Sequence, residues 1–92
     1  MSSVVLTLQE EAVPLVRSGL AMKRAALSLN LKRYSQRLKD FEQRYHMDSQ
    51  TFAARFGRGE LGDEADWFEW EYVLQAYQET IRQLKILERL SV

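Results

Sequence analysis

A hydrophobic side chain returns every seven residues through positions 13–45, and this spacing constrains the fold more than any other feature. Because seven residues make almost two helical turns, residues with this spacing form a stripe along one side of a helix. Residues 20–46 contain neither glycine nor proline. The pattern therefore predicts one long helix, whose two heptad rows are Val13, Leu20, Leu27, Tyr34 and Phe41, and Arg17, Arg24, Leu31, Leu38 and Tyr45.

The residues before and within the start of this stripe carry several local signals. Ser2–Leu8 is rich in β-forming residues and could make a short strand. Thr7 and Glu10 have the T-x-x-E spacing of a capping box, and Pro14 fits the first turn of a helix. Gly19 costs about 1 kcal/mol in a helix interior, so the first helix could bend or break there.

A short connector and a second long helix are predicted in the other half of the chain. Asp48 and Ser49 are N-cap candidates for a connector helix that carries Phe52, Ala53 and Phe56 and ends at Gly57, Gly59 and Gly62. Asp63 is a suitable N-cap for the second long helix, which runs to about Leu90. Its heptad rows are Trp67, Leu74 and Ile81, and Trp70, Tyr77 and Leu84.

The formal charge of the chain is zero, but its charges are segregated. Residues 1–46 hold eight bases and four acids, whereas residues 47–92 hold five bases and nine acids. Two apolar stripes joined by a short connector predict an all-α fold, an antiparallel helical hairpin with residues 31–46 beside residues 63–78. The basic end of the first helix would then face the acidic start of the second.

A hairpin of two helices leaves apolar residues uncovered. A dimer that closes into a bundle, or a partner protein, would cover them. We therefore expect a single helical domain over residues 1–92 that forms a homo-oligomer. The uncovered residues are expected to be Ala26 and Leu29 beside the first stripe, and Val73, Leu87 and Leu90 beside the second.

The composition argues against several classes of protein. The absence of cysteine excludes disulfides, thiolate zinc sites and cysteine nucleophiles, and the one histidine, His46, is expected to cap a helix C-terminus. The run Gly57–Gly62 spells G-x-G-x-x-G, but a helix precedes it and the nearby acids would repel a phosphate. No apolar run reaches the roughly 20 residues that span a bilayer, and no secretory signal opens the chain. We expect a cytoplasmic protein that is not an enzyme and binds no cofactor, no metal and no membrane.

The most unusual segment is residues 60–71, which hold six acids, no base and three large aromatic residues. On a helix, Trp70 would face the core together with Trp67, whereas Phe68 lies on a neighbouring face. At least one of the three aromatic residues is therefore available to a partner, and an acidic, aromatic surface suits a basic protein. The residues predicted to bind this partner are Glu60, Leu61, Asp63, Glu64, Trp67, Phe68 and Glu71.

The same segment carries a resemblance to a known group of proteins. The resemblance covers residues 34–77, and its most specific element is Gly59-Glu60-Leu61-Gly62-Asp63 followed by Asp66-Trp67-Phe68-Glu69-Trp70. It also includes Tyr34, Leu38, Phe41, Glu42, Tyr45, Met47, Phe52 and Phe56. In this region the chain resembles small prokaryotic antitoxin-like proteins associated with TumE-type toxin genes. The resemblance implies one half of a toxin–antitoxin pair, which neutralises a toxin encoded next door by occluding it.

Two other functions are compatible with the sequence. A DNA-binding autorepressor would use the bases of the first long helix, but the zero net charge and the acidic second helix disfavour duplex binding. The chain could instead be a purely structural helical dimer. The bases in question are Lys32, Arg33, Arg37, Lys39 and Arg44, which alternate with Tyr34 and Tyr45.

Overall fold

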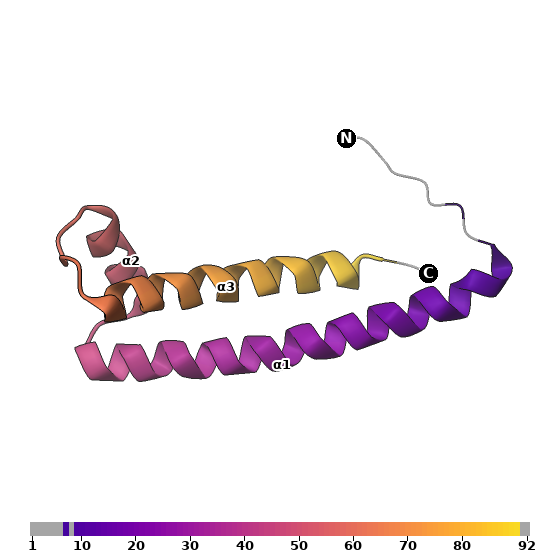
Figure 1. Cartoon of the computed structure of the whole chain (residues 1–92), viewed down its shortest axis with the longest axis horizontal. Coiled ribbons are helices and arrows are strands. Elements are labelled where there is room, and N and C mark those ends of the chain that lie inside the picture. The colour runs from indigo at the N-terminus through magenta and orange to yellow at the C-terminus, as the bar shows by residue number, and fades with distance from the viewer. Residues whose placement is uncertain (1–6, 8, 91–92) are drawn as a thin grey trace.

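The computed structural model describes residue 7 and residues 9–90, and every regular element in that part of the chain is helical. A 3-10 turn, η1 (Glu10–Ala12), is followed by the helices α1 (Val13–Tyr45), α2 (Ser49–Gly57) and α3 (Ala65–Glu88) (Figure 1). The prediction of an all-α fold is thereby confirmed. The strand expected at Ser2–Leu8 lies outside the described residues except for Thr7, which belongs to no helix or strand.

Helix α1 is continuous over 33 residues and passes through Gly19 without a break. Pro14 lies in its first turn, as predicted, where a backbone N–H is not needed. The predicted capping box is wrong, because Gln9 rather than Thr7 precedes the first helical turn and no side chain caps it. At the other end His46 is the C-cap, as predicted, and its left-handed φ of 54° turns the chain out of the helix.

The connector begins with a capped helix and ends with a glycine-rich turn. The Asp48 carboxylate accepts a hydrogen bond of 2.7 Å from the backbone N–H of Thr51, which confirms Asp48 as the N-cap of α2. At Gly62 the chain takes a φ of 83°, and it is still extended at Glu64, where ψ is 143°. Helix α3 therefore begins after Glu64, and the prediction of Asp63 as its N-cap is wrong.

Helices α1 and α3 lie side by side and run in opposite directions (Figure 1). Near the end of α3 the Arg24 guanidinium donates to the Leu87 carbonyl at 3.4 Å. Towards the connector an ion pair joins Arg37 to Glu69. The basic C-terminal half of α1 thus lies along the acidic first turns of α3, where opposite charges attract.

The main hydrophobic core lies at the connector end, where all three α-helices meet. Phe52 and Trp70 are fully buried there. Val73, which was expected to be uncovered, is buried in this core. Leu87, also expected to be uncovered, is buried near the other end of α3, beside Leu27 of α1. Leu29 and Leu90 are exposed, as expected. The buried members of this core are Leu38, Phe41, Phe52, Trp67, Trp70 and Val73.

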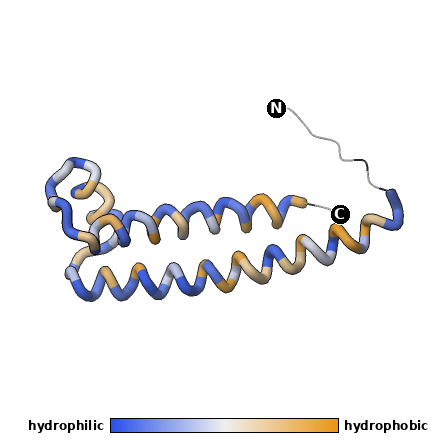
Figure 2. Tube along the Cα trace, viewed as in Figure 1, coloured by the Kyte–Doolittle hydropathy of each residue, from blue (hydrophilic) through white to orange (hydrophobic). Residues whose placement is uncertain are grey.

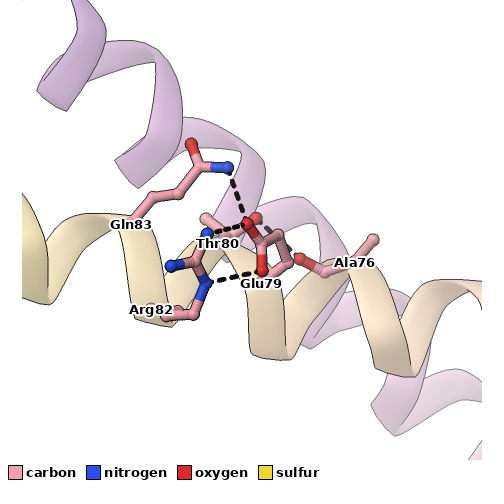
Figure 3. A network of polar contacts seen from close by, with 5 residues as sticks. All are labelled: Ala76, Glu79, Thr80, Arg82 and Gln83. Carbon is pink, nitrogen blue, oxygen red and sulfur yellow. Dashed lines mark hydrogen bonds and ion pairs between the residues drawn. The ribbon is translucent and has the colours of Figure 1, made fainter.

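The middle of α3 contains several side-chain hydrogen bonds within the helix (Figure 3). The Glu79 carboxylate accepts hydrogen bonds from Arg82 Nε at 2.8 Å and from Gln83 Nε2 at 3.1 Å. These bonds, chiefly those from Arg82, lower the pKa of Glu79 to about 2. On the same stretch the Thr80 hydroxyl donates to the Ala76 carbonyl at 2.7 Å. The contacts stabilise the middle of α3 without involving another helix.

The two long helices differ in length, with 33 residues in α1 and 24 in α3. At about 1.5 Å per residue α1 is longer by roughly 13 Å. Its N-terminal turns continue past the end of α3, and Figure 2 shows several apolar residues in them. Among the described residues, no helix combines the length and apolar character needed to cross a membrane.

Candidate functional site

A buried polar relay holds the three α-helices together at the connector end. The Trp70 indole N–H donates to Ser49 Oγ at 3.0 Å, and Ser49 Oγ in turn donates to the Glu42 carboxylate at 2.9 Å. The same carboxylate oxygen accepts the backbone N–H of Ser49 at 2.8 Å. Glu42 therefore satisfies a free N–H at the start of α2, where a negative charge is also favoured by the helix dipole.

Stacked rings surround this relay. The Trp70 ring lies 4.0 Å from the Phe52 ring, centroid to centroid, with an angle of 2° between the planes. It also stacks with the Phe41 ring at 5.4 Å and with the Tyr45 ring at 6.0 Å, centroid to centroid. One residue from each of α2 and α3 and two from α1 thus form a continuous stack, which gives the start of α3 a rigid base.

Asp66 ties the first turn of α3 to the last turn of α1. Its carboxylate accepts a short hydrogen bond from the Tyr45 hydroxyl and pairs with Arg44 at 3.1 Å. The hydrogen bond from Tyr45, assisted by Arg44, holds the pKa of Asp66 below its ordinary value. Of the six acids in residues 60–71, Asp66 is therefore one that binds α1 rather than remaining available to a partner.

Phe68 projects from this rigid base towards solvent. Its side chain is 53% exposed, although one edge of the ring meets the Phe56 ring at 5.4 Å in a T-shaped contact. Tyr72, one helical turn further along α3, is 69% exposed. The prediction did not include Tyr72, although its spacing of four residues from Phe68 places both on one side of the helix.

The other predicted partner-binding residues fall into three groups. Asp63 and Glu64 are exposed, and Glu71 is half-buried and accepts a hydrogen bond from Gln75. Glu60 is exposed but already pairs with Arg58 of the same turn at 2.8 Å. Together with Phe68 and Tyr72, these side chains form what we call the acidic-aromatic surface: Glu60, Asp63, Glu64, Phe68, Glu71 and Tyr72.

Trp67 and Leu61 do not belong to that surface. Trp67 is only 8% exposed, because its ring packs between Tyr45 and Phe52. The expectation that Trp67 faces a partner is therefore corrected: it is a core residue, like Trp70. Leu61 is half-buried against the same core. The buried Trp67 indole N–H has no hydrogen-bond partner among the described residues, which is unfavourable for folding.

The described residues contain no group of three or more His, Cys, Asp or Glu side chains that could hold a metal ion. The connector end instead presents a rigid, charged and aromatic surface. No protein-family model, curated protein or solved structure matches the chain.

Proposed function

We propose that the chain is a non-catalytic protein-binding module, the antitoxin-like member of a prokaryotic toxin–antitoxin pair. In this proposal the acidic-aromatic surface binds a small basic protein and occludes the surface by which that protein acts. Helices α1 and α3 form an antiparallel hairpin that dimerises, so that one assembly carries two binding surfaces. Both proteins would act in the cytoplasm.

The observation that carries the proposal is the position of Phe68. A large aromatic side chain that is 53% exposed presents apolar surface that a bound partner would remove from water. Phe68 lies two residues before Trp70 on α3, and the Trp70 ring is fixed in the stacked core. Aromatic residues on rigid supports are the usual anchors of protein interfaces, because little side-chain freedom is lost on binding.

The charges around Phe68 favour a basic partner. Asp63 and Glu64 are exposed and form no ion pair within the described residues, whereas Asp66 and Glu69 are held by arginines of α1. Unpaired acids at the rim of an interface accelerate the approach of a positively charged protein. The acids of this segment therefore divide into those that hold the two long helices together and those that remain for a partner.

The test is a calorimetric titration against the small basic protein encoded by the adjacent gene. Phe68→Ala should weaken binding by about 2 kcal/mol or more, or roughly thirtyfold, if Phe68 is a central anchor. Its melting temperature should change little, because the side chain is half in water. Ile86→Ala is the matched control, since Ile86 is 45% exposed near the other end of α3 and should leave binding unchanged.

A charge-reversal variant distinguishes the effect of the acids on the association rate from the effect of Phe68 on the stability of the complex. Glu64→Lys should mainly slow association, with a smaller effect on dissociation. If Phe68→Ala and Ile86→Ala affect the affinity equally, or if the wild-type chain binds no such protein, the proposal is wrong.

One observation favours a second candidate, a DNA-binding autorepressor. No acid occurs between residues 13 and 39 of α1, although that stretch contains seven bases. Four of these bases, Lys23, Lys32, Arg33 and Lys39, are exposed. Tight, strongly salt-dependent binding to the promoter of its own gene would favour this function over the first.

A further inference from the structure

The N-terminal half of α1 has an apolar side that faces away from α3. Leu15, Met22 and Leu29 follow one another at intervals of seven residues and are 75%, 71% and 50% exposed. Leu27, two residues before Leu29, is buried against α3. Because two residues turn a helix by about 200°, the three exposed side chains lie on the opposite side of α1 from α3. We call this line the outer stripe.

The outer stripe carries no charge between Leu15 and Leu29. Two bases of this segment are used on other sides of α1: Arg24 donates to the Leu87 carbonyl of α3, and Lys23 lines a shallow groove with Leu27 and Ile86. The positions between the three large residues are small and exposed: Ser18, Gly19, Ala25 and Ala26. Small residues between large ones allow a second helix to approach closely.

Gly19 is not required by any packing contact within the single chain. A Cβ added to it would meet no atom within 4 Å, so packing inside the chain does not require glycine. In a helix interior glycine is nevertheless about 1 kcal/mol less favourable than alanine. Its place beside the outer stripe leaves room for a second helix to approach closely.

Opposite charges flank the outer stripe at equal distances from its centre. Glu11 lies eleven residues before Met22, and Arg33 lies eleven residues after it. Both side chains are exposed. At 100° per residue, Arg33 falls on the same side of α1 as the stripe, and Glu11 lies in the 3-10 turn η1 that leads into α1. Along the sequence, Leu15 and Leu29 thus lie at equal distances on either side of Met22, and so do the oppositely charged Glu11 and Arg33.

We propose that a second copy of the chain packs on the outer stripe, antiparallel to the first, with the two-fold axis at Met22. In this register Leu15 of each copy faces Leu29 of the other, and the two Met22 side chains meet at the axis. Glu11 of each copy then faces Arg33 of the other. A parallel pair would instead oppose like charges at both ends, so the charges select the antiparallel arrangement.

This dimer interface does not depend on the proposed toxin-binding function. The outer stripe lies on α1 and away from α3, whereas the acidic-aromatic surface lies on α3 and the connector. The two surfaces can therefore be tested by separate variants, and the loss of one need not affect the other.

The first test is sedimentation equilibrium at micromolar concentration. The wild-type chain should be a dimer, and Met22→Glu should weaken the dimer about a hundredfold or more, because two like charges would meet at the axis. Since Met22 is 71% exposed in the single chain, circular dichroism should show unchanged helix. Tyr72→Glu is the matched control: its side chain is 69% exposed on α3, and the variant should remain a dimer.

The second test examines the register. Arg33→Glu and Glu11→Arg should each weaken the dimer about tenfold, and the double variant should recover it, because the opposite charges are restored. Since the chain has no cysteine, Met22→Cys should form a disulfide-linked dimer under mild oxidation, whereas Ala21→Cys, one residue off the stripe, should not.

Several outcomes would overturn the proposal. A wild-type monomer would do so, and so would a dimer that survives Met22→Glu or a double charge variant that is no better than the single ones. Binding of a monomer to phosphatidylserine vesicles that Met22→Glu abolishes would assign the stripe to a lipid surface instead.

Discussion

Trp67 and Trp70 lie one turn apart on α3, and replacing each with phenylalanine should affect folding stability differently. Both rings are buried, so both substitutions remove a similar amount of apolar contact. The two indole N–H groups differ: that of Trp70 donates to Ser49 Oγ at 3.0 Å, whereas that of Trp67 has no partner among the described residues. The pair therefore isolates the contribution of one buried hydrogen bond.

The magnitudes follow from these contacts. Loss of the larger ring should cost about 1–2 kcal/mol of unfolding free energy at either position. At Trp70 the lost hydrogen bond adds about 1 kcal/mol, for a total of roughly 2–3 kcal/mol. At Trp67 the substitution also removes a buried, unpaired N–H, whose desolvation penalty of about 1–3 kcal/mol is then no longer incurred. The net change in unfolding free energy should therefore be close to zero.

Urea denaturation followed by circular dichroism measures both effects. In a chain of this size, each kcal/mol should also shift the melting temperature by about 4–8 °C. The slope of the free energy against urea should be the same for both variants, since neither changes the surface exposed on unfolding. Equal losses at the two positions, or a larger loss for Trp67→Phe, would refute the reasoning from hydrogen bonding.

Two further predictions concern acid and the glycine-rich turn. The lowered pKa values of Glu79 and Asp66 mean that the unfolded chain binds protons first, so stability should fall as the pH drops below about 4.5 and, for Glu79, continue to fall to about 2. Tyr45→Phe should raise the pKa of Asp66, as NMR titration of the carboxyl carbons would show; an unchanged value would contradict the hydrogen bond. Gly62→Ala should destabilise the chain by about 1–2 kcal/mol because its φ is 83°, whereas Gly57→Ala, at the end of α2, should be neutral or stabilising; equal melting temperatures would contradict this.

The sequence predicted best the features that depend on local spacing. The heptad rows predicted the long helix that became α1, and Asp48 and His46 occupy the predicted caps of α2 and α1. Trp70 lies in the core, and Phe68 is exposed, as their positions on a helix indicated. These features were predictable because side chains three to seven residues apart already determine which side of a helix is apolar.

Other features depended on how α2 folds against the long helices. The sequence placed Trp67 beside Phe68 in a partner-binding segment, but Phe52 of α2 packs over the Trp67 ring and removes it from solvent. The role of Glu42 was equally hidden, since its carboxylate reaches Ser49 only after the turn at His46 reverses the chain.

The amino-acid sequence by itself determined that this chain makes long helices, where they are apolar and where their charges lie. Only the tertiary structure decided which of those side chains remain exposed. Burial at the connector end depends on three helices meeting, and Leu15 and Met22 remain exposed because α3 packs against the opposite side of α1. Periodicity identifies an apolar face, but only a packed neighbour determines whether that face is core or surface.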